Sequence, residues 1–253
     1  IFISNLVASG VTFLLLFPEV AATKWRIHSD TLKKMLFYAF PLLFAGMAGI
    51  VNETFDRLLL RYLLPNDIAA SQVGIYSACY KISILMTIFI QAYRYAAEPF
   101  FFAQAKEKDA KLVYAHIMDY FIIVVSLIFL TTMVYLDDFV LTFIGANYRE
   151  GRSVIPVLML ANLFLGVYYN LSIWYKLVGK TIWGAWISII GAVITLVLNL
   201  WWIPLSPDHL IYGYYGSAWA TFICYAAMMM FSYLIGQKYF PIQYNLKKFF
   251  GYL

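Results

Sequence analysis

Charged residues are scarce in this sequence, since Asp, Glu, Lys and Arg make up only 12% of its 253 residues. Soluble domains carry about 25% charged residues, which they need to cover a surface that faces water. The chain is instead 63% hydrophobic, and its mean hydropathy is +0.77. Despite a formal net charge of +5, this composition argues against a soluble enzyme and against a nucleic-acid-binding protein. It predicts a membrane protein that crosses the bilayer several times.

Cysteine is almost absent, and the two that occur, Cys79 and Cys224, lie far apart within apolar stretches. This arrangement predicts two buried thiols and neither a disulfide framework nor a metal site.

Enzyme motifs are missing as well. Residues 179–181 (Gly-Lys-Thr) look like the end of a phosphate-binding loop, but Trp174 stands where that motif requires a glycine. We therefore expect no enzyme activity, no bound metal and no resident cofactor.

Long apolar segments dominate the chain, and each is long enough for a transmembrane helix, which takes about 20 residues. Residues 1–18 are expected to be the end of a preceding transmembrane helix, in a chain that is part of a longer protein. A lobe of six full spans follows at residues 35–236. The segments are too long for strands and lack their alternation. The predicted fold class is therefore all-α, a polytopic transmembrane helix bundle. The six spans are predicted at about residues 35–64, 73–102, 112–135, 154–178, 181–203 and 211–236.

Lys and Arg are distributed unevenly between the connections, and this orients the chain in the membrane. Thirteen of them lie on one side, in alternate connections, and two lie on the other side. Because the basic side faces the cytoplasm, the linker 19–34 and the tail 237–253 are expected to be cytoplasmic. The tail mixes basic and aromatic residues, which suits either the surface of an anionic inner leaflet or a simple end-of-chain anchor.

Ionisable side chains within the spans are the candidate functional residues, because a charge at the bilayer centre costs at least about 2.5–3.5 kcal/mol. In the span at 35–64, Glu53, Arg57 and Arg61 recur every four residues and share one helix face. Asn52 and Asp56 form the neighbouring row.

The next two spans carry Lys81, Arg94 and Glu98, followed by Asp119. Arg94 and Glu98, like Glu53 and Arg57 in the preceding span, have two interpretations: self-neutralising pairs that let helices pack, or the lining of a hydrated cavity. Lys81 has no acid three or four residues away, which favours a place in a cavity. Near the ends of their spans, Arg61 and Arg94 can also extend to the interface.

Prolines and aromatic residues add two further predictions. Pro41 and Pro99 each remove a backbone hydrogen bond from a span and are predicted hinges. Tyrosines and tryptophans near the span ends are interpreted as interfacial belts rather than as a platform for sugars, although those facing a cavity leave the second interpretation open. They include Tyr168, Tyr169, Trp174, Tyr175, Trp201, Trp202, Tyr212, Tyr214 and Tyr215.

Two stretches resemble a known family. The first runs from Leu32 to Leu42 and continues through Asn52 to the Asp-Arg pair at 56–57. The second, residues 73–82, contains Gly-Ile-Tyr-Ser followed by Lys81. Together they resemble the polysaccharide flippases of the multidrug, oligosaccharidyl-lipid and polysaccharide exporter superfamily, over the chain from about residue 24 to its end.

The resemblance implies two six-helix lobes around a central cavity, with this chain as the second lobe and a missing N-terminal lobe as its partner. It also implies that a lipid-linked oligosaccharide is flipped across the bacterial cytoplasmic (inner) membrane by alternating access, for surface polysaccharide biosynthesis. Arg57 and Lys81 would hold the diphosphate or form the gate, and Glu53 and Asp56 would be their counter-ions.

Three alternatives stay open. A drug or cation antiporter of the same superfamily would use Glu53, Asp56 and Asp119, although basic residues at similar depth argue against it. A membrane-embedded glycan polymerase or ligase would need a catalytic constellation and a large outer loop, and the sequence has neither. A non-transporting scaffold is the third. The coupling ion of a transporter, H⁺ or Na⁺, also stays open.

Overall fold

The computed structural model describes residues 2–22, 28–245, 247–248 and 251 of the chain. Over these residues the protein is α-helical and contains no β-strand. Seven helical segments are long and apolar enough to cross a membrane. The prediction of an all-α, multi-pass membrane protein is therefore confirmed. The chain divides into two compact units, Ile1–Phe37 and Tyr38–Leu253.

The first unit contains α1 (Phe2–Ala22) and the beginning of α2 (Ser29–Leu63). Helix α1 has no buried side chain and runs through Pro18, so it extends further than the expected end at residue 18. The connection between α1 and α2 is shorter than the predicted linker 19–34, because α2 already begins at Ser29. Asp30 in the first turn of α2 interacts favourably with the helix dipole. Two basic residues of that linker, Lys24 and Arg26, lie outside the described residues.

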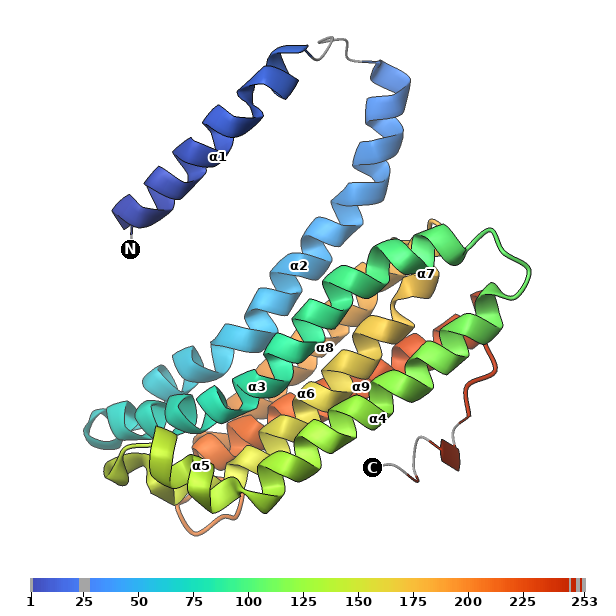
Figure 1. Cartoon of the computed structure of the whole chain (residues 1–253). Helices are drawn as coiled ribbons and strands as arrows, with labels where there is room; N and C mark the ends of the chain where they lie inside the picture. Colours follow the sequence, from blue (N-terminus) through green and yellow to red (C-terminus); the bar gives the residue numbers. More distant parts are fainter. Residues whose placement is uncertain (1, 23–27, 246, 249–250, 252–253) are drawn as a thin grey trace. The chain divides into compact units, whose positions relative to one another are not determined.

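The second unit is a helical bundle that contains the rest of α2. Its long helices are α3 (Asn66–Gln104), α4 (Ala110–Val134), α6 (Val154–Leu171), α8 (Ile182–Trp202) and α9 (Tyr214–Tyr239). Helix α6 packs most extensively against α9 and also contacts α3 and α4, so it lies at the centre of the bundle (Figure 1). At Gly166, α6 approaches Phe121 and Ile90 so closely that a β-carbon would collide with them.

The connections are more helical than the sequence predicts. Helix α3 begins at Asn66 rather than near residue 73, because Pro65 with its fixed φ makes a tight turn directly before it. The predicted loop at 136–153 folds into α5 (Leu136–Phe143) and the 3-10 helix η1 (Ala146–Ser153). The predicted span 154–178 is divided at Ser172 into α6 and a short helix, α7 (Ile173–Leu177).

The start of the predicted tail packs against the bundle. Ile242 is buried, and the side-chain amide of Gln237 donates a hydrogen bond of 2.7 Å to its carbonyl oxygen. The Lys111 ammonium lies 4.9 Å from the centre of the Phe240 ring. These contacts favour the end-of-chain anchor for residues 240–245, while the aromatic residues at 249, 250 and 252 lie outside the described part of the chain.

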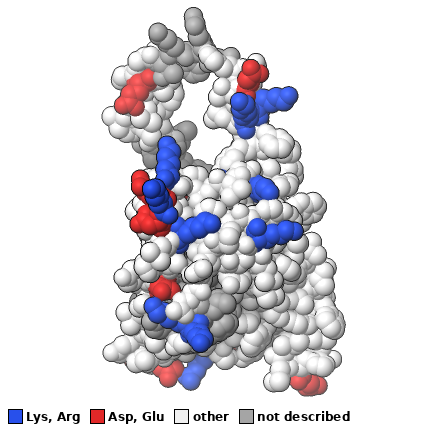
Figure 2. Space-filling view, turned by 90° about the vertical axis from the view of Figure 1, so that its right-hand side faces the viewer, with Lys and Arg blue, Asp and Glu red and all other residues white. Residues whose placement is uncertain are grey.

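Basic side chains gather near the connection between α3 and α4. This connection carries Lys106 and Lys108, and Lys111 follows in the first turn of α4. Figure 2 looks at the molecule from this side and shows Lys and Arg on a surface that is otherwise mostly uncharged.

Candidate functional site

A cavity of about 640 Å³ lies within the second unit, among the transmembrane helices. Five helices and the short α7 contribute side chains to it, so residues far apart in the sequence share one wall. Polar, charged and aromatic groups are mixed along this wall. The polar and aromatic side chains that line it are Tyr38, Asn52, Glu53, Gln91, Arg94, Glu98, Phe102, Tyr168, Tyr169, Ser172, Tyr175, Lys176, Ser188 and Tyr225.

Three charged side chains of this wall form one cluster. Lys176 Nζ donates a hydrogen bond of 2.6 Å to Glu98 Oε1, and only 12% of the Lys176 side chain is exposed. Arg94 Nε lies 3.9 Å from Glu98 Oε2, so one carboxylate bridges two cations. The Arg94 guanidinium also stacks on Tyr169, 4.5 Å from the ring centre. The predicted pairing of Arg94 with Glu98 is confirmed, and both residues also line the cavity.

Lys176 was missed as a site residue, because the sequence places it in a basic turn at the end of a span. The break at Ser172 starts a new short helix, and the side chain of Lys176 then reaches Glu98 on α3. A signal was present in the sequence, since Lys176 falls within the apolar segment 154–178 rather than beyond it.

Tyrosines provide much of the cavity wall. Tyr168 and Tyr175 are only 3% and 4% exposed, and both line the cavity together with Tyr169. These three are therefore among the aromatic residues that face a cavity, for which the interpretation as a platform for sugars stays open. Trp201 is different, because it is 66% exposed on the outside of α8. The helix rotation that separates the two groups is set by packing, so residue type alone does not distinguish them.

A second polar cluster lies around Asp56, which is 1% exposed. The carboxylate accepts hydrogen bonds from Tyr76 Oη at 2.7 Å, Thr221 Oγ1 at 2.8 Å and Asn199 Nδ2 at 3.0 Å. These donors come from α3, α9 and α8, and all of them are neutral. Four helices therefore meet at one acidic side chain, which we call the Asp56 cluster.

The Asp56 cluster continues to the cavity through Asn52. Thr195 Oγ1 donates to Asn52 Oδ1 at 3.1 Å, and Asn52 itself lines the cavity. Sequence reasoning missed the partners on α8 and α9. A signal for them existed, because polar residues recur four positions apart in otherwise apolar helices: Thr195 with Asn199, and Ser217 with Thr221.

The predicted counter-ion role of Asp56 is not what the structure shows. Neither Arg57 nor Lys81 forms an ion pair with it within the described residues. Arg57 Nη1 instead donates to the main-chain oxygen of Glu53 at 2.9 Å, and its guanidinium lies 4.5 Å from the centre of the Tyr80 ring. The carboxylate of Glu53 faces the cavity and has no hydrogen-bond or ion-pair partner in the described part of the chain.

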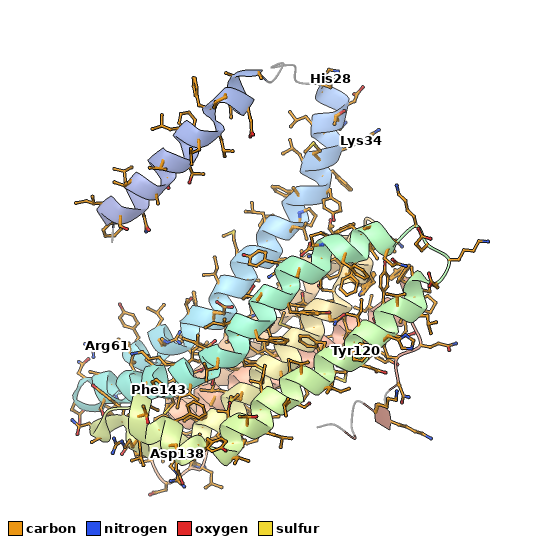
Figure 3. All side chains as sticks on the ribbon, in the orientation of Figure 1. His28, Lys34, Arg61, Tyr120, Asp138 and Phe143 are labelled. Atoms are coloured by element: carbon orange, nitrogen blue, oxygen red, sulfur yellow. The ribbon has the colours of Figure 1, made fainter. Side chains whose placement is uncertain are left out.

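The remaining predicted residues lie outside the cavity. Arg57 and Arg61 line a shallow groove on the outside of α2, and Figure 3 shows Arg61 at the edge of the bundle. Lys81 is exposed on α3. Asp119 on α4 pairs with Lys248 at 3.4 Å.

The prolines of α2 and α3 and the two cysteines are the remaining predictions, the first as hinges and the second as buried thiols. Helices α2 and α3 continue through Pro41 and Pro99, so their role as hinges stays a prediction. Cys79 and Cys224 are buried free thiols, as predicted. The described residues contain no cluster of three or more His, Cys, Asp or Glu side chains suited to a metal ion.

No protein-family model matches the sequence, and no curated protein and no solved structure matches the chain. Function is therefore inferred from the cavity and from the two polar clusters beside it.

Proposed function

We propose that this protein is a membrane transporter that flips a polyprenyl-diphosphate-linked oligosaccharide across the bacterial cytoplasmic membrane by alternating access. The observation that carries this proposal is the polar cavity of about 640 Å³ among transmembrane helices. Its volume lies within the roughly 300–1,000 Å³ that is typical of ligand sites. Charged groups at membrane depth are costly and usually mark a path for a polar solute.

The wall chemistry suits a phosphorylated sugar. Arg94 and Lys176 are cations that can hold phosphate oxygens through charge-assisted hydrogen bonds. Tyr168, Tyr169 and Tyr175 present aromatic faces and hydroxyl groups, which suit the apolar and polar faces of a sugar ring. In this proposal the polyprenyl chain stays in the lipid, and a preceding lobe of the same protein closes the open side of the cavity. The transport step needs no covalent chemistry.

We place the coupling ion, a proton or Na⁺, at the Asp56 cluster. Asp56 is enclosed by neutral donors, so the carboxylate carries the only charge among these four side chains. A bound proton or Na⁺ would neutralise it. Its donors belong to α3, α8 and α9, while Asp56 itself belongs to α2. An ion bound there would therefore favour one packing of these helices over another, which is what coupling requires.

A second candidate is a drug or cation antiporter of similar architecture. The observation that favours it is Glu53, whose carboxylate faces the cavity without a partner in the described part of the chain. An organic cation could pair with it. The two basic side chains on the same wall, Arg94 and Lys176, favour an anionic substrate instead.

The test uses cells that lack the complete gene. We expect lipid-linked oligosaccharide to accumulate on the cytoplasmic leaflet, measured by its accessibility to an impermeant lectin in inside-out and right-side-out vesicles. The wild-type gene and a Lys180→Gln variant should relieve the accumulation, whereas Lys176→Gln should not. Lys180 is the matched control because it lies over the Tyr239 ring rather than in the cavity wall.

Unchanged glycan distribution, together with altered resistance to cationic compounds, would reject the flippase and support the antiporter. Glu53→Gln would then be the variant to examine.

A further inference from the structure

The anion in the charged cluster of the cavity comes from the protein itself. Glu98 Oε1 accepts from Lys176 Nζ at 2.6 Å, and Glu98 Oε2 lies 3.9 Å from Arg94 Nε. The carboxylate thus lies between the two cations of the wall, so an anion that binds both cations must compete with it. All three side chains line the cavity.

The two cations differ in how much they depend on Glu98. Lys176 is only 12% exposed, so it needs a negative partner close by. Arg94 is 40% exposed and also stacks on Tyr169, so it is already stabilised on another side. Any anion that replaces Glu98 must therefore satisfy Lys176 first.

Resting on the proposed function, we infer that Glu98 is an internal competitor that makes the cavity selective for a diphosphate over a monophosphate. A diphosphate carries more negative charge and more oxygens than a monophosphate, so it competes better with the carboxylate for Lys176 and Arg94. A monophosphate offers fewer oxygens and less charge, and it displaces the carboxylate poorly. Glu98 thus produces selectivity by weakening the binding of the monophosphate, not by strengthening that of the diphosphate.

Such selectivity would let the protein distinguish two lipids that differ only in their phosphate groups. A polyprenyl monophosphate has the same apolar chain as the diphosphate, and where both lipids occur in one bilayer the protein must tell them apart. Binding energy from the chain cannot separate the two lipids, because it is common to both. Discrimination must then come from the phosphate end, where Glu98 lies.

The experiment measures binding of two probes, farnesyl diphosphate and farnesyl monophosphate, to the purified full-length protein in lipid nanodiscs. For the wild type we expect the diphosphate to bind about tenfold more tightly than the monophosphate. Glu98→Gln keeps the shape of the side chain and removes its charge. It should strengthen binding of the monophosphate more than that of the diphosphate, so that the ratio falls by about fivefold.

Matched variants control for general charge effects. Glu107→Gln removes an acid from the exposed α3–α4 connection and should leave the ratio unchanged. Lys176→Gln should weaken diphosphate binding by about tenfold. If that variant does not elute as a folded protein in gel filtration, Arg94→Gln serves the same purpose, because its side chain is more exposed.

An unchanged ratio in Glu98→Gln, or no binding of either probe to the wild type and to this variant, would overturn the inference. The vesicle assay of leaflet distribution is independent of it. Transport without an effect of Glu98 rejects only the selectivity role, whereas selective binding without glycan accumulation in the deletion strain rejects only the flippase.

Discussion

Asp56 and Lys176 are both ionisable residues within transmembrane helices, but the protein stabilises them in different ways. Asp56 is surrounded by three neutral donors, whereas Lys176 has a charged partner, Glu98. The three hydrogen bonds stabilise the Asp56 carboxylate, and none of them comes from a charged group. Lys176 is held by the Glu98 carboxylate at 2.6 Å, and any other anion that binds Lys176 must replace this partner. The two surroundings are the reason why the proposal assigns coupling to Asp56 and substrate binding to Lys176.

Asp56 provides the first prediction. Asp56→Leu removes the carboxylate that Tyr76, Asn199 and Thr221 share. Asn199 and Thr221 still donate to the main-chain oxygens of Thr195 and Ser217, at 2.8 Å and 2.9 Å, but the Tyr76 hydroxyl loses its acceptor at 2.7 Å. Leaving that buried group unsatisfied costs about 1–3 kcal/mol. We expect the midpoint of thermal unfolding of the purified protein to fall clearly. Asp56→Asn keeps an acceptor oxygen and should unfold close to the wild type, but lose the dependence of transport on the coupling ion. Equal stability of Asp56→Leu and wild type would contradict the described hydrogen bonds.

The cations Arg57 and Lys81, which do not line the cavity, provide the second prediction. Neither has an ion-pair partner among the described residues, so their loss leaves no buried charge behind. Because both side chains lie outside the cavity wall, we expect Arg57→Ala and Lys81→Ala to accumulate normally in the membrane, as measured by immunoblotting, and to keep glycan export close to that of the wild type. Asp67→Ala, at the exposed start of α3, is the control. A fall of export to about a tenth in either variant, the loss of one charge-assisted contact, would place that residue on the transport path.

At the scale of elements, the position of α6 determines the site. This helix lies at the centre of the bundle, and its end at Ser172 places α7 against α3. The cavity wall therefore depends on how closely α6 approaches its neighbours. Gly166 is a point of close approach, because a side chain there would meet Phe121 and Ile90.

Gly166→Val is the prediction at this scale. The added side chain must push α6 away from α3 and α4, and such overpacking costs about 1–3 kcal/mol. We expect a lower unfolding midpoint and weaker binding of the diphosphate probe, since the wall moves with the helix. Gly10→Val is the matched control, because a β-carbon at Gly10 meets no atom within 4 Å and Gly10 does not line the cavity. It should be as stable as the wild type or more so.

At the scale of the whole molecule, the spans and the uneven distribution of Lys and Arg together define a topology. The connection between α3 and α4 is basic, whereas the turn at 204–210 has no Lys or Arg. The positive-inside rule puts the first in the cytoplasm and the second outside. Native Cys79 and Cys224 are buried, so new cysteines can be labelled selectively.

This topology gives the fourth prediction. An impermeant maleimide should label Ser206→Cys in intact spheroplasts, and it should label Lys108→Cys only after permeabilisation. Wild-type protein, with its two buried thiols, is the control and should remain unlabelled. The reverse pattern would show that the chain is inserted the other way round.

The sequence alone determined the fold class, the number of spans and the membrane location, because long apolar segments need no other part of the chain to be recognised. It also identified several ionisable residues at membrane depth, including Glu53, Arg94 and Glu98 in the cavity wall.

Only the tertiary structure decided which of these residues act together. Asp56 and Asn199 meet across 143 positions, and Lys176 reaches Glu98 across 78. Such contacts depend on the rotation of each helix and on the break at Ser172. The rotation and the break are set by packing between helices. The apolar pattern of a membrane-spanning segment does not reveal them, because hydrophobic residues lie on all sides of the helix.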